Sequence, residues 1–284
     1  MNKINGTILV TGACGMIGSA TVCGLLDAGY RVIGVDVKDS SEASNEYIHY
    51  TVDLSNNEQI EKIFEENKID RVIHLAALAH SVDGKKYTWE DYYHLNVSCS
   101  KNIFNIVNSI PLLFISTVDV YGFAEGTVDI STEVAPVSHY AKSKVLAEQE
   151  CRKLVNYAIY RLSPVYTDTV KRDIQKRYYL KYPNIAYQIG AGKEYEILNI
   201  KEAVSAFVKW CDNGSINEIR ILKDPKCMNT SDCIAEEKKA GRANIVLRFP
   251  NWMVKFGYTV LKALTGKNKY TFLLHKAVYP LRTE

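Results

Sequence analysis

Short apolar segments alternate with longer amphipathic segments along the first half of the chain. The apolar segments are rich in Val, Ile and Leu, which predicts buried strands, whereas apolar residues that recur every three or four positions predict helices. The predicted strands are Thr7–Val10, Arg31–Val35, Tyr47–Thr51, Arg71–Leu75, Leu112–Ile115 and Tyr157–Leu162. The predicted helices are Met16–Ala28, Asn57–Asn67, Trp89–Ser109 and His139–Asn156. This alternation predicts an α/β fold built on a doubly wound parallel sheet.

A glycine-rich loop, Thr11-Gly12-Ala13-Cys14-Gly15-Met16-Ile17-Gly18, joins the first predicted strand to the first predicted helix. Glycine allows the backbone to turn tightly and to approach a pyrophosphate, and the free amides at a helix start attract anions. We therefore expect the loop to bind the phosphates of a dinucleotide and the sheet to be of the Rossmann type. The residues expected to contact the cofactor here are Gly12, Cys14, Gly15, Met16, Ile17 and Gly18.

Asp36 follows the second predicted strand, about 20 residues beyond the glycine-rich loop. An acidic residue at this place accepts hydrogen bonds from the hydroxyls of the adenosine ribose and repels a 2′-phosphate. The sequence therefore favours NAD over NADP as the cofactor.

Length and composition indicate a globular chain without a nucleic-acid partner. The 284 residues are 47% hydrophobic and carry a formal net charge of only +3, with basic residues spread among acidic ones. The seven cysteines are odd in number and lack close metal-ligand spacing, which favours a reducing cytoplasm and predicts no metal site. The apolar part of the first strand is too short for an export signal, and no apolar stretch is long enough to span a bilayer.

Tyr140 and Lys144 lie four residues apart in a predicted helix. This spacing stacks the phenol and the ammonium on one helix face, where a positive neighbour lowers the pKa of a phenol toward working pH. A tyrosine so placed exchanges protons with an alcohol. The spacing alone is weak evidence in a chain with 19 tyrosines, but together with the nucleotide loop it indicates hydride chemistry.

Six motifs follow one another along the chain: Thr11–Gly18, Asp53-Leu54, His74-Leu75-Ala76-Ala77, Ser116–Gly122, Tyr140-x-x-x-Lys144 and Arg161–Tyr166. In this order they resemble the motifs of the extended short-chain dehydrogenase/reductase family, also called the NAD-dependent epimerase/dehydratase family. The likeness covers roughly the first 200 residues. It implies further contacts with NAD at the adenine edge, beside the central ribose and phosphates, and at the nicotinamide. The residues implied are Asp53, Leu54, Leu75, Ala76, Ala77, Tyr140, Lys144, Pro164 and Val165.

The resemblance also implies a catalytic set. Thr117 matches the family's catalytic Ser or Thr, whose hydroxyl bonds the sugar alcohol or ketone, and Ser116 is the alternative. Tyr140 would exchange the proton, while Lys144 would anchor the ribose and stabilise the phenolate. Asn96 matches the helix asparagine that supports the active site.

The function implied by this resemblance is that of an NAD-dependent epimerase or 4-ketoreductase acting on a nucleotide sugar, in surface-polysaccharide synthesis. Dehydration is disfavoured, because the acid pair that follows the catalytic threonine in 4,6-dehydratases is only half present, as Val118 and Asp119. Two alternatives stay open: an NAD(H)-dependent dehydrogenase or reductase of a different hydroxy compound, and a cofactor-binding regulatory or scaffold protein without turnover.

Residues 1–166 are expected to form the NAD-binding Rossmann domain, and 167–284 a smaller substrate-binding region of which about 193–212 packs back on the Rossmann domain. Relatives in this family pair through two helices, here 89–109 and 139–156, which predicts a homodimer. Sugar-nucleotide relatives commonly carry an arginine for the diphosphate in the stretch that corresponds to 190–199, and this chain has none there. The arginines available to replace it are Arg172, Arg177, Arg220, Arg242 and Arg248.

The segment from Trp252 to Leu264 carries an apolar stripe with lysines between its members. The pattern occurs in helices that lie at a membrane interface and in helices that pack on a domain core, and the second interpretation is preferred. The apolar residues are Met253, Phe256, Val260, Leu261 and Leu264, and the lysines are Lys255 and Lys262.

Overall fold

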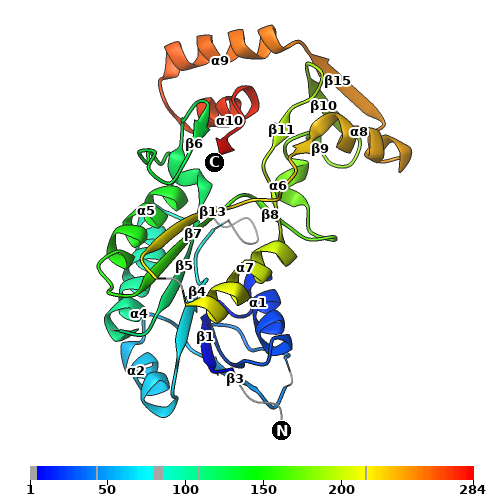
Figure 1. Ribbon diagram of the computed structural model, residues 1–284. Helices are drawn as coiled ribbons and strands as arrows, with labels where there is room; N and C mark the ends of the chain where they lie inside the picture. The colour runs from blue at the N-terminus through cyan, green and yellow to red at the C-terminus, as the bar shows by residue number, and fades with distance from the viewer. Residues whose placement is uncertain (1–4, 43, 80–85, 108, 215) are drawn as a thin grey trace. The chain divides into compact units, whose positions relative to one another are not determined.

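The computed structural model describes residues 5–42, 44–79, 86–107, 109–214 and 216–284 (Figure 1). The chain divides into two compact units, and each consists of several segments. The first unit comprises Met1–Thr117, His139–Arg161 and Ile200–Arg220, and the second comprises Val118–Ser138, Leu162–Asn199 and Ile221–Glu284. The sequence predicts a boundary at residue 166, with about 193–212 packing back on the Rossmann domain, and this division stays a prediction.

A seven-stranded sheet with the order β13-β7-β5-β4-β1-β2-β3 forms the centre of the first unit. The strands are β1 (Thr7–Thr11), β2 (Arg31–Asp36), β3 (Tyr47–Thr51), β4 (Arg71–His74), β5 (Leu112–Thr117), β7 (Tyr157–Leu162) and β13 (Glu218–Leu222). The chain winds outward in one direction from β1 through β2 to β3 and in the other from β4 to β5, through parallel pairs. The predicted Rossmann-type sheet is therefore confirmed, and its switch point lies between β1 and β4, where ligands bind at the carboxyl ends of strands.

Two layers of helices cover the sheet. Figure 1 shows α1 and α7 on one face and α2, α4 and α5 on the other. The close approach of α1 to α7 requires a glycine, because a Cβ atom on Gly24 would lie 2.3 Å from the side chain of Val204. The helices are α1 (Met16–Asp27), α2 (Asn57–Glu66), α3 (Trp89–Tyr93), α4 (Cys99–Val107), α5 (His139–Cys151) and α7 (Ile200–Asn213).

Two predicted helices differ from those observed. The single helix predicted over 89–109 is interrupted by a π-helical turn, His94–Ser98, between α3 and α4. The helix predicted to reach Asn156 ends at Cys151. It ends there because the amides of Lys153 and Leu154 donate to carbonyls three residues back, which tightens the chain into a turn.

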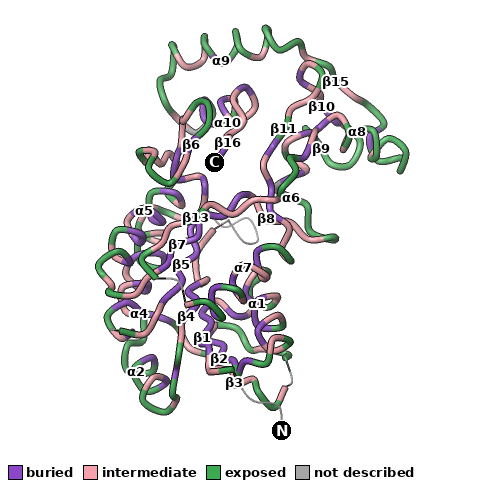
Figure 2. Tube along the Cα trace, viewed as in Figure 1, coloured by how far each residue is buried: buried purple, intermediate pink, exposed green. Residues whose placement is uncertain are grey.

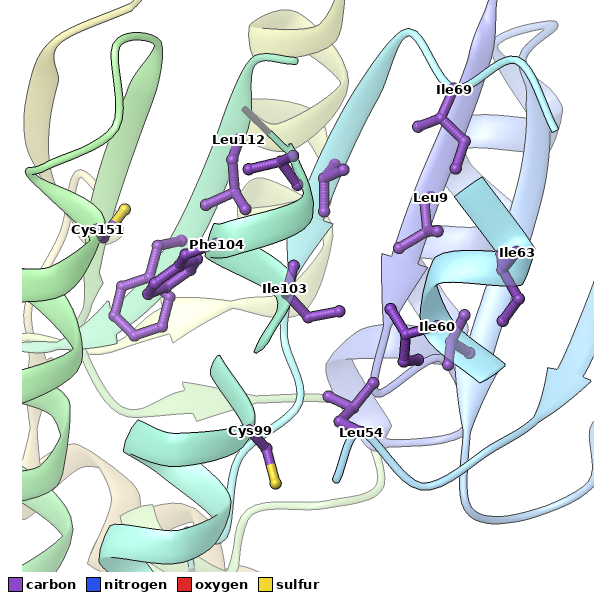
Figure 3. Close-up of a cluster of buried hydrophobic side chains, with 14 of the residues drawn as sticks. Leu9, Leu54, Ile60, Ile63, Ile69, Cys99, Ile103, Phe104, Leu112 and Cys151 are labelled. Carbon is purple, nitrogen blue, oxygen red and sulfur yellow. The ribbon is translucent and has the colours of Figure 1, made fainter. Parts of the chain in front are cut away.

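One hydrophobic core of the first unit lies between the sheet and the layer formed by α2, α4 and α5. Figure 3 shows Leu9 and Leu112 from the strands facing Ile60, Ile103 and Phe104 from the helices. These side chains are almost fully buried, and burial of each contributes about 1.5–3 kcal/mol. The packing of this apolar layer positions the carboxyl ends of the strands, and the residues predicted to bind the cofactor follow these ends.

The second unit contains short strands and helices around a smaller aromatic core that includes Tyr178, Tyr179 and Tyr195. Its main sheet has the order β15-β10-β9. The strands are β6 (Thr127–Val128), β8 (Val165–Tyr166), β9 (Tyr179–Lys181), β10 (Ile185–Ile189), β11 (Glu194–Tyr195), β12 (Leu198–Asn199), β14 (Met228–Asn229), β15 (Ile245–Phe249) and β16 (Arg282–Thr283). The helices are α6 (Arg172–Gln175), α8 (Thr230–Lys239), α9 (Asn251–Thr265) and α10 (Lys269–Val278), and a 3₁₀ turn covers Val118–Tyr121.

The apolar stripe of α9 does not pack on a core, contrary to the preferred interpretation of its sequence. Figure 2 shows most of this helix as exposed, and Phe256 and Leu264 are 65% and 78% exposed. The contact with the rest of the unit comes from another side of the helix, where Tyr258 is buried. Among the residues that the structure describes, no helix has the length and apolar character needed to cross a bilayer.

Candidate active site

The glycine-rich loop has a backbone that only glycine fits at two positions. Gly12 has a φ of 70°, and a Cβ atom there would lie 2.8 Å from the backbone of Ala76. A Cβ atom on Gly18 would lie 2.0 Å from the carbonyl oxygen of Gly12. Helix α1 begins after Gly15, which has no side chain to cap the first amides. The loop therefore leaves amides at a helix start for an anion, as a bound dinucleotide pyrophosphate requires.

Asp36, at the end of β2, is held beside this loop. One carboxylate oxygen accepts a hydrogen bond from the amide of Cys14 at 3.0 Å, and the other accepts one from the amide of Lys38 at 3.0 Å. Each carboxylate oxygen has a second lone pair to accept from a ribose hydroxyl. The loop and Asp36 thus fit the phosphate and ribose ends of NAD.

The loop after β4, which contains Leu75, Ala76 and Ala77, is fixed by a buried histidine. His74 Nδ1 lies 2.7 Å from the Thr11 hydroxyl, which also accepts a hydrogen bond from the amide of Ala76. Burial lowers the pKa of His74 to about 3, so the imidazole is neutral. In the part of the chain that the structure describes, no three His, Cys, Asp or Glu side chains are arranged to hold a metal ion.

Asp53 and Leu54 follow β3 and begin the turn into α2. Asp53 accepts a hydrogen bond from the amide of Ser55 at 2.8 Å, which holds the pKa of the Asp53 carboxyl below its usual value. Asn102 on α4 donates to the carbonyl of Leu54 at 2.9 Å. The position of this pair is therefore set by the helices on that face of the sheet.

Asn96 lies in the π-helical turn and joins two parts of the site. Its side-chain oxygen accepts from the amide of Leu78 at 2.6 Å, and its side-chain nitrogen donates to the hydroxyl of Ser143 at 2.9 Å. Ser143 in turn donates to the carbonyl oxygen of Tyr140. The extra residue of a π turn re-aims side chains, a common feature of functional sites. Here the turn aims Asn96 at both the loop after β4 and the first turn of α5.

Ser116 and Thr117, at the end of β5, have different surroundings. The Ser116 hydroxyl donates to Glu148 at 2.6 Å, and Arg161 donates to both oxygens of the same carboxylate, at 3.1 and 2.7 Å. All three residues are buried. The hydroxyl of Ser116 is therefore committed to the core, whereas Thr117 is half-buried at the strand end.

Tyr140 and Lys144 lie one turn apart on α5, which packs against β5. Tyr140 is half-buried, and Lys144 is only 2% exposed. The Lys144 ammonium lies 4.0 Å from the ring centre of Phe114. Burial lowers the pKa of Lys144 to about 7, although the charge of Glu148 raises it. A lysine that titrates near neutral pH in the core is costly to the fold, and such residues cluster at functional sites.

Replacing Lys144 by Met should stabilise the fold at neutral pH by about 2–4 kcal/mol, because the buried ammonium is removed with little change in volume. The folded-state pKa lies below the unfolded-state value, so the cost of the charge is full below pH 7. It disappears as the pH rises through 7 toward 10.5, and the gain should disappear with it. Urea unfolding of both proteins at several pH values measures this. The exposed neighbour Lys142→Met is the control, and an equal gain at every pH would contradict the prediction.

A pocket within the second unit brings together polar residues from two of the motifs and from segments outside them. Asp119 and Lys276 form an ion pair of 2.6 Å in its wall, and the Arg177 guanidinium lies 4.5 Å from the ring centre of Tyr195. The hydroxyl of Ser163 is buried without a hydrogen-bond partner among the described residues. The described residues that line the pocket are Val118, Asp119, Gly122, Ala124, Ser163, Pro164, Arg177, Tyr195, Glu196, His275, Lys276, Tyr279 and Leu281.

The pocket bears on the choice among the five arginines considered as replacements. Of those whose side chains the structure describes, Arg177 lines the pocket. Arg220 and Arg242 instead form ion pairs with Glu218 and Glu237. Pro164 also lines the pocket, and Val165 lies in β8, paired with β12. The sequence names Arg177 only as one of several candidates, and the folded chain places it in the pocket.

Known proteins resemble this chain in sequence and in fold. The sequence model of the NAD dependent epimerase/dehydratase family matches residues 8–212. A UDP-glucose 4-epimerase of Arabidopsis thaliana is 33% identical over 168 residues, which are 51% of this chain and 46% of that protein. The UDP-glucose 4-epimerase of Bacillus subtilis is 31% identical over 162 residues, 52% of this chain and 47% of that protein. The chain thus spans about half the length of the curated relatives it matches.

Solved structures share the fold over most of the chain. A UDP-glucuronic acid 4-epimerase from Bacillus cereus in complex with NAD has a TM-score of 0.69 and 21% identity, covering 86% of this chain and 87% of that one. A dTDP-glucose 4,6-dehydratase from Bacillus anthracis in complex with NAD has a TM-score of 0.68 and 20% identity, covering 86% and 84%. At this identity the likeness shows the fold alone.

Proposed function

The chain belongs to the NAD-dependent epimerase/dehydratase family, and from this premise we propose that it is an NAD-dependent epimerase or 4-ketoreductase acting on a nucleotide sugar. That membership confirms the predicted cofactor, NAD. The observation that carries the proposal is the arrangement of α5 and β5. Tyr140 stands one turn before a buried lysine, on the helix that packs against the strand ending at Thr117.

The chain's own residues divide the chemistry among them. Thr117 donates a hydrogen bond to the reacting sugar oxygen and holds it, while Tyr140 takes the proton from that oxygen or returns it. Lys144 supplies the positive charge that favours the phenolate form of Tyr140. Asn96 and Ser143 position Tyr140 through the first turn of α5. The bound nicotinamide supplies the hydride acceptor and donor.

The preference for NAD provides a direct test of Asp36. Asp36→Ala should weaken NAD binding by roughly 10- to 100-fold, because charge-assisted hydrogen bonds to the ribose are lost. The variant should also narrow the difference in affinity between NAD and NADP, because the repulsion of the 2′-phosphate is removed. Calorimetric titration of both cofactors measures this, with the exposed neighbour Asp39→Ala as the control. Equal affinity of the native protein for the two cofactors would overturn the assignment.

The substrate class is supported by both comparison and charge. The curated relatives are UDP-glucose 4-epimerases, and a nucleotide sugar carries a diphosphate. Arg177 has no carboxylate within ion-pair distance among the described residues, and in the same pocket Ser163 has an unused hydroxyl. Arginine binds phosphate and carboxylate groups with paired hydrogen bonds. We therefore assign Arg177 the role of binding an anionic group of the sugar nucleotide. The product of the reaction would serve surface-polysaccharide synthesis.

Dehydration remains disfavoured. The position that carries the second acid of a 4,6-dehydratase is Asp119, and its carboxylate is ion-paired with Lys276 at 2.6 Å. An ion pair favours the charged form of a carboxyl group and reduces its basicity. The position before it is Val118, which exchanges no proton.

A product assay tests the function and separates it from the alternatives. The protein is incubated with NAD and individual UDP- or dTDP-linked hexoses, and the sugars are identified by nuclear magnetic resonance. Interconversion of 4-epimers, or reduction of a 4-keto sugar by NADH, is expected. Turnover of a hydroxy compound that carries no nucleotide would favour the dehydrogenase alternative. Cofactor binding without turnover of any of these compounds would favour the scaffold.

We further propose a homodimer formed through α3, α4 and α5. Tyr93, at the end of α3, and Leu95, in the π-helical turn, are exposed apolar side chains. Helix α3 contacts α5 through Trp89 and His139. A two-fold interface buries such a patch against its own copy. Sedimentation at micromolar concentration should show a dimer that Tyr93→Glu combined with Leu95→Glu dissociates. A native monomer would contradict this proposal.

The cytoplasm is the compartment that we propose for the protein. All seven cysteines are free thiols, and two of them, Cys23 and Cys227, are exposed to solvent. Exposed thiols persist in a reducing compartment, whereas export exposes them to oxidation.

A further inference from the structure

Helix α9 presents a continuous apolar stripe to solvent. Trp252 is 70% exposed, and Phe256, Val260 and Leu264 follow it at intervals of four residues. At 100° per residue these four side chains, with Met253, fall within one third of the helix circumference. Tyr258, on the opposite side, is the buried contact with the rest of the unit. The stripe therefore takes no part in packing α9 on the rest of the unit. Large exposed apolar patches of this kind mark interaction sites.

The surrounding segment is strongly basic. From Lys238 to Thr283 the sequence contains no Asp or Glu, while the chain as a whole has a net charge of only +3. Arg242, Lys276 and Arg282 form ion pairs with acidic residues outside the segment, whereas the two lysines of α9 form none among the described residues. The basic residues of the segment are Lys238, Lys239, Arg242, Arg248, Lys255, Lys262, Lys267, Lys269, Lys276 and Arg282.

The lysines near the stripe form no ion pairs among the described residues, although the charge of Glu125 acts on Lys262. Within the described residues, the ammonium groups of Lys255, Lys262 and Lys267 lie over aromatic rings, at 5.7, 5.2 and 5.6 Å from the ring centres, and none forms an ion pair. By helix geometry Lys255 and Lys262 lie on the flank between the exposed stripe and the packed side. This placement puts positive charge beside the apolar surface and leaves it available to an external anion.

We propose that α9 docks the protein on the surface of a membrane that contains anionic lipids, with its exposed stripe in the interfacial region. The chemistry matches on both counts: Trp, Phe and Leu enter the boundary between headgroups and acyl chains, and the flanking lysines meet negative headgroups. The inference goes beyond the proposed function and does not depend on which sugar is the substrate. The helix lies on the membrane rather than across it.

Charge favours a membrane over a second copy of the chain as the occupant of this surface. In a two-fold interface through α9, Lys255 and Lys262 of each copy would face the same basic surface of the other. Like charges brought together at an interface cost several kcal/mol. An anionic bilayer has no such penalty, and each lysine near it contributes about 1 kcal/mol.

Binding to vesicles tests the proposal. The full chain with bound NAD is sedimented with vesicles of phosphatidylcholine alone and with vesicles that also contain phosphatidylglycerol. Binding is expected to the second composition, to fall as salt is added, and to be much weaker to the first. Lys255→Gln combined with Lys262→Gln should reduce the partition coefficient roughly 30-fold, which corresponds to about 1 kcal/mol per lysine. Lys209→Gln, at an exposed position of α7, is the matched control and should leave binding unchanged.

The apolar contribution is tested separately. Phe256→Glu combined with Leu264→Glu should abolish binding at low salt, because two apolar side chains that would be buried among the lipids are replaced by charged ones. Val155→Glu replaces an equally exposed apolar residue of the first unit and should have no effect. Both α9 positions are exposed, so the fold should persist, and NAD binding by each variant verifies this. Trp252 should also show a blue-shifted emission on binding that Trp252→Phe removes.

Two results would overturn the proposal. One is native protein that stays in solution with phosphatidylglycerol vesicles at low salt. The other is vesicle binding that the Phe256 and Leu264 substitutions leave intact. If the same substitutions instead dissociated an oligomer of a protein that binds no vesicles, the stripe would be an interface between copies.

Discussion

Tyr140→Phe should reduce turnover of the sugar nucleotide by roughly 100- to 10,000-fold while leaving NAD binding nearly unchanged. The substitution removes the hydroxyl proton that the reaction transfers and keeps the aromatic ring. The tyrosine carbonyl that holds Ser143 is also kept. Single-turnover kinetics with the substrate identified by the product assay, together with calorimetric titration of NAD, measure the two quantities separately.

Tyr92→Phe is the matched control for this prediction. Tyr92 is half-buried on α3, and its ring packs against His139, the residue before Tyr140. It should keep full activity, because its hydroxyl is assigned no part in the reaction. Full activity in Tyr140→Phe itself would exclude Tyr140 as the proton carrier and would leave only the nucleotide-binding part of the assignment.

Arg161→Met should lower the free energy of unfolding by about 3–5 kcal/mol, which is a large part of the stability of a typical domain. The loss arises because Glu148 would remain buried without its bidentate partner. The Ser116 hydroxyl and Arg152, at 3.5 Å, would remain in contact with its carboxylate, and the charge of Lys144 would still act on it. Urea unfolding at pH 7 measures this difference.

The double variant Arg161→Met with Glu148→Met should recover most of that stability, since both charges are removed and their space is filled. Arg220→Met is the surface control. Arg220 forms an exposed pair with Glu218, and its replacement should cost less than about 1 kcal/mol. A double variant no more stable than Arg161→Met would show that the pair is not coupled.

Much of the first unit could be predicted from local sequence. Strands buried on both faces need continuous apolar runs, so the runs identify β1, β2, β3, β4, β5 and β7 directly. The apolar pattern does not predict β13, the edge strand of the sheet, because Glu218 and Arg220 interrupt its apolar residues. The two-residue strands of the second unit exist through their partners, and no local pattern marks them.

The candidate site divides in the same way. Glycine positions, Asp36 and the Tyr140–Lys144 spacing are local features, and the sequence predicts them. The role of Glu148 depends on residues 32 and 13 positions away in the sequence, so only the folded chain reveals it. The α9 stripe shows a further limit, because periodicity predicts an apolar helix face without predicting what covers it.

The buried carboxylate of Glu148 has a consequence for genetics. It secures Ser116, the neighbour of Thr117, and the same side chain keeps Arg161 in the core. A screen that scores only growth on the product would therefore rank Glu148 beside Tyr140 as indispensable, although Glu148 touches no substrate. Suppressor mutations should distinguish the two residues. A second substitution that stabilises the fold elsewhere can rescue a variant of Glu148, whereas no such substitution restores the proton carrier in a variant of Tyr140.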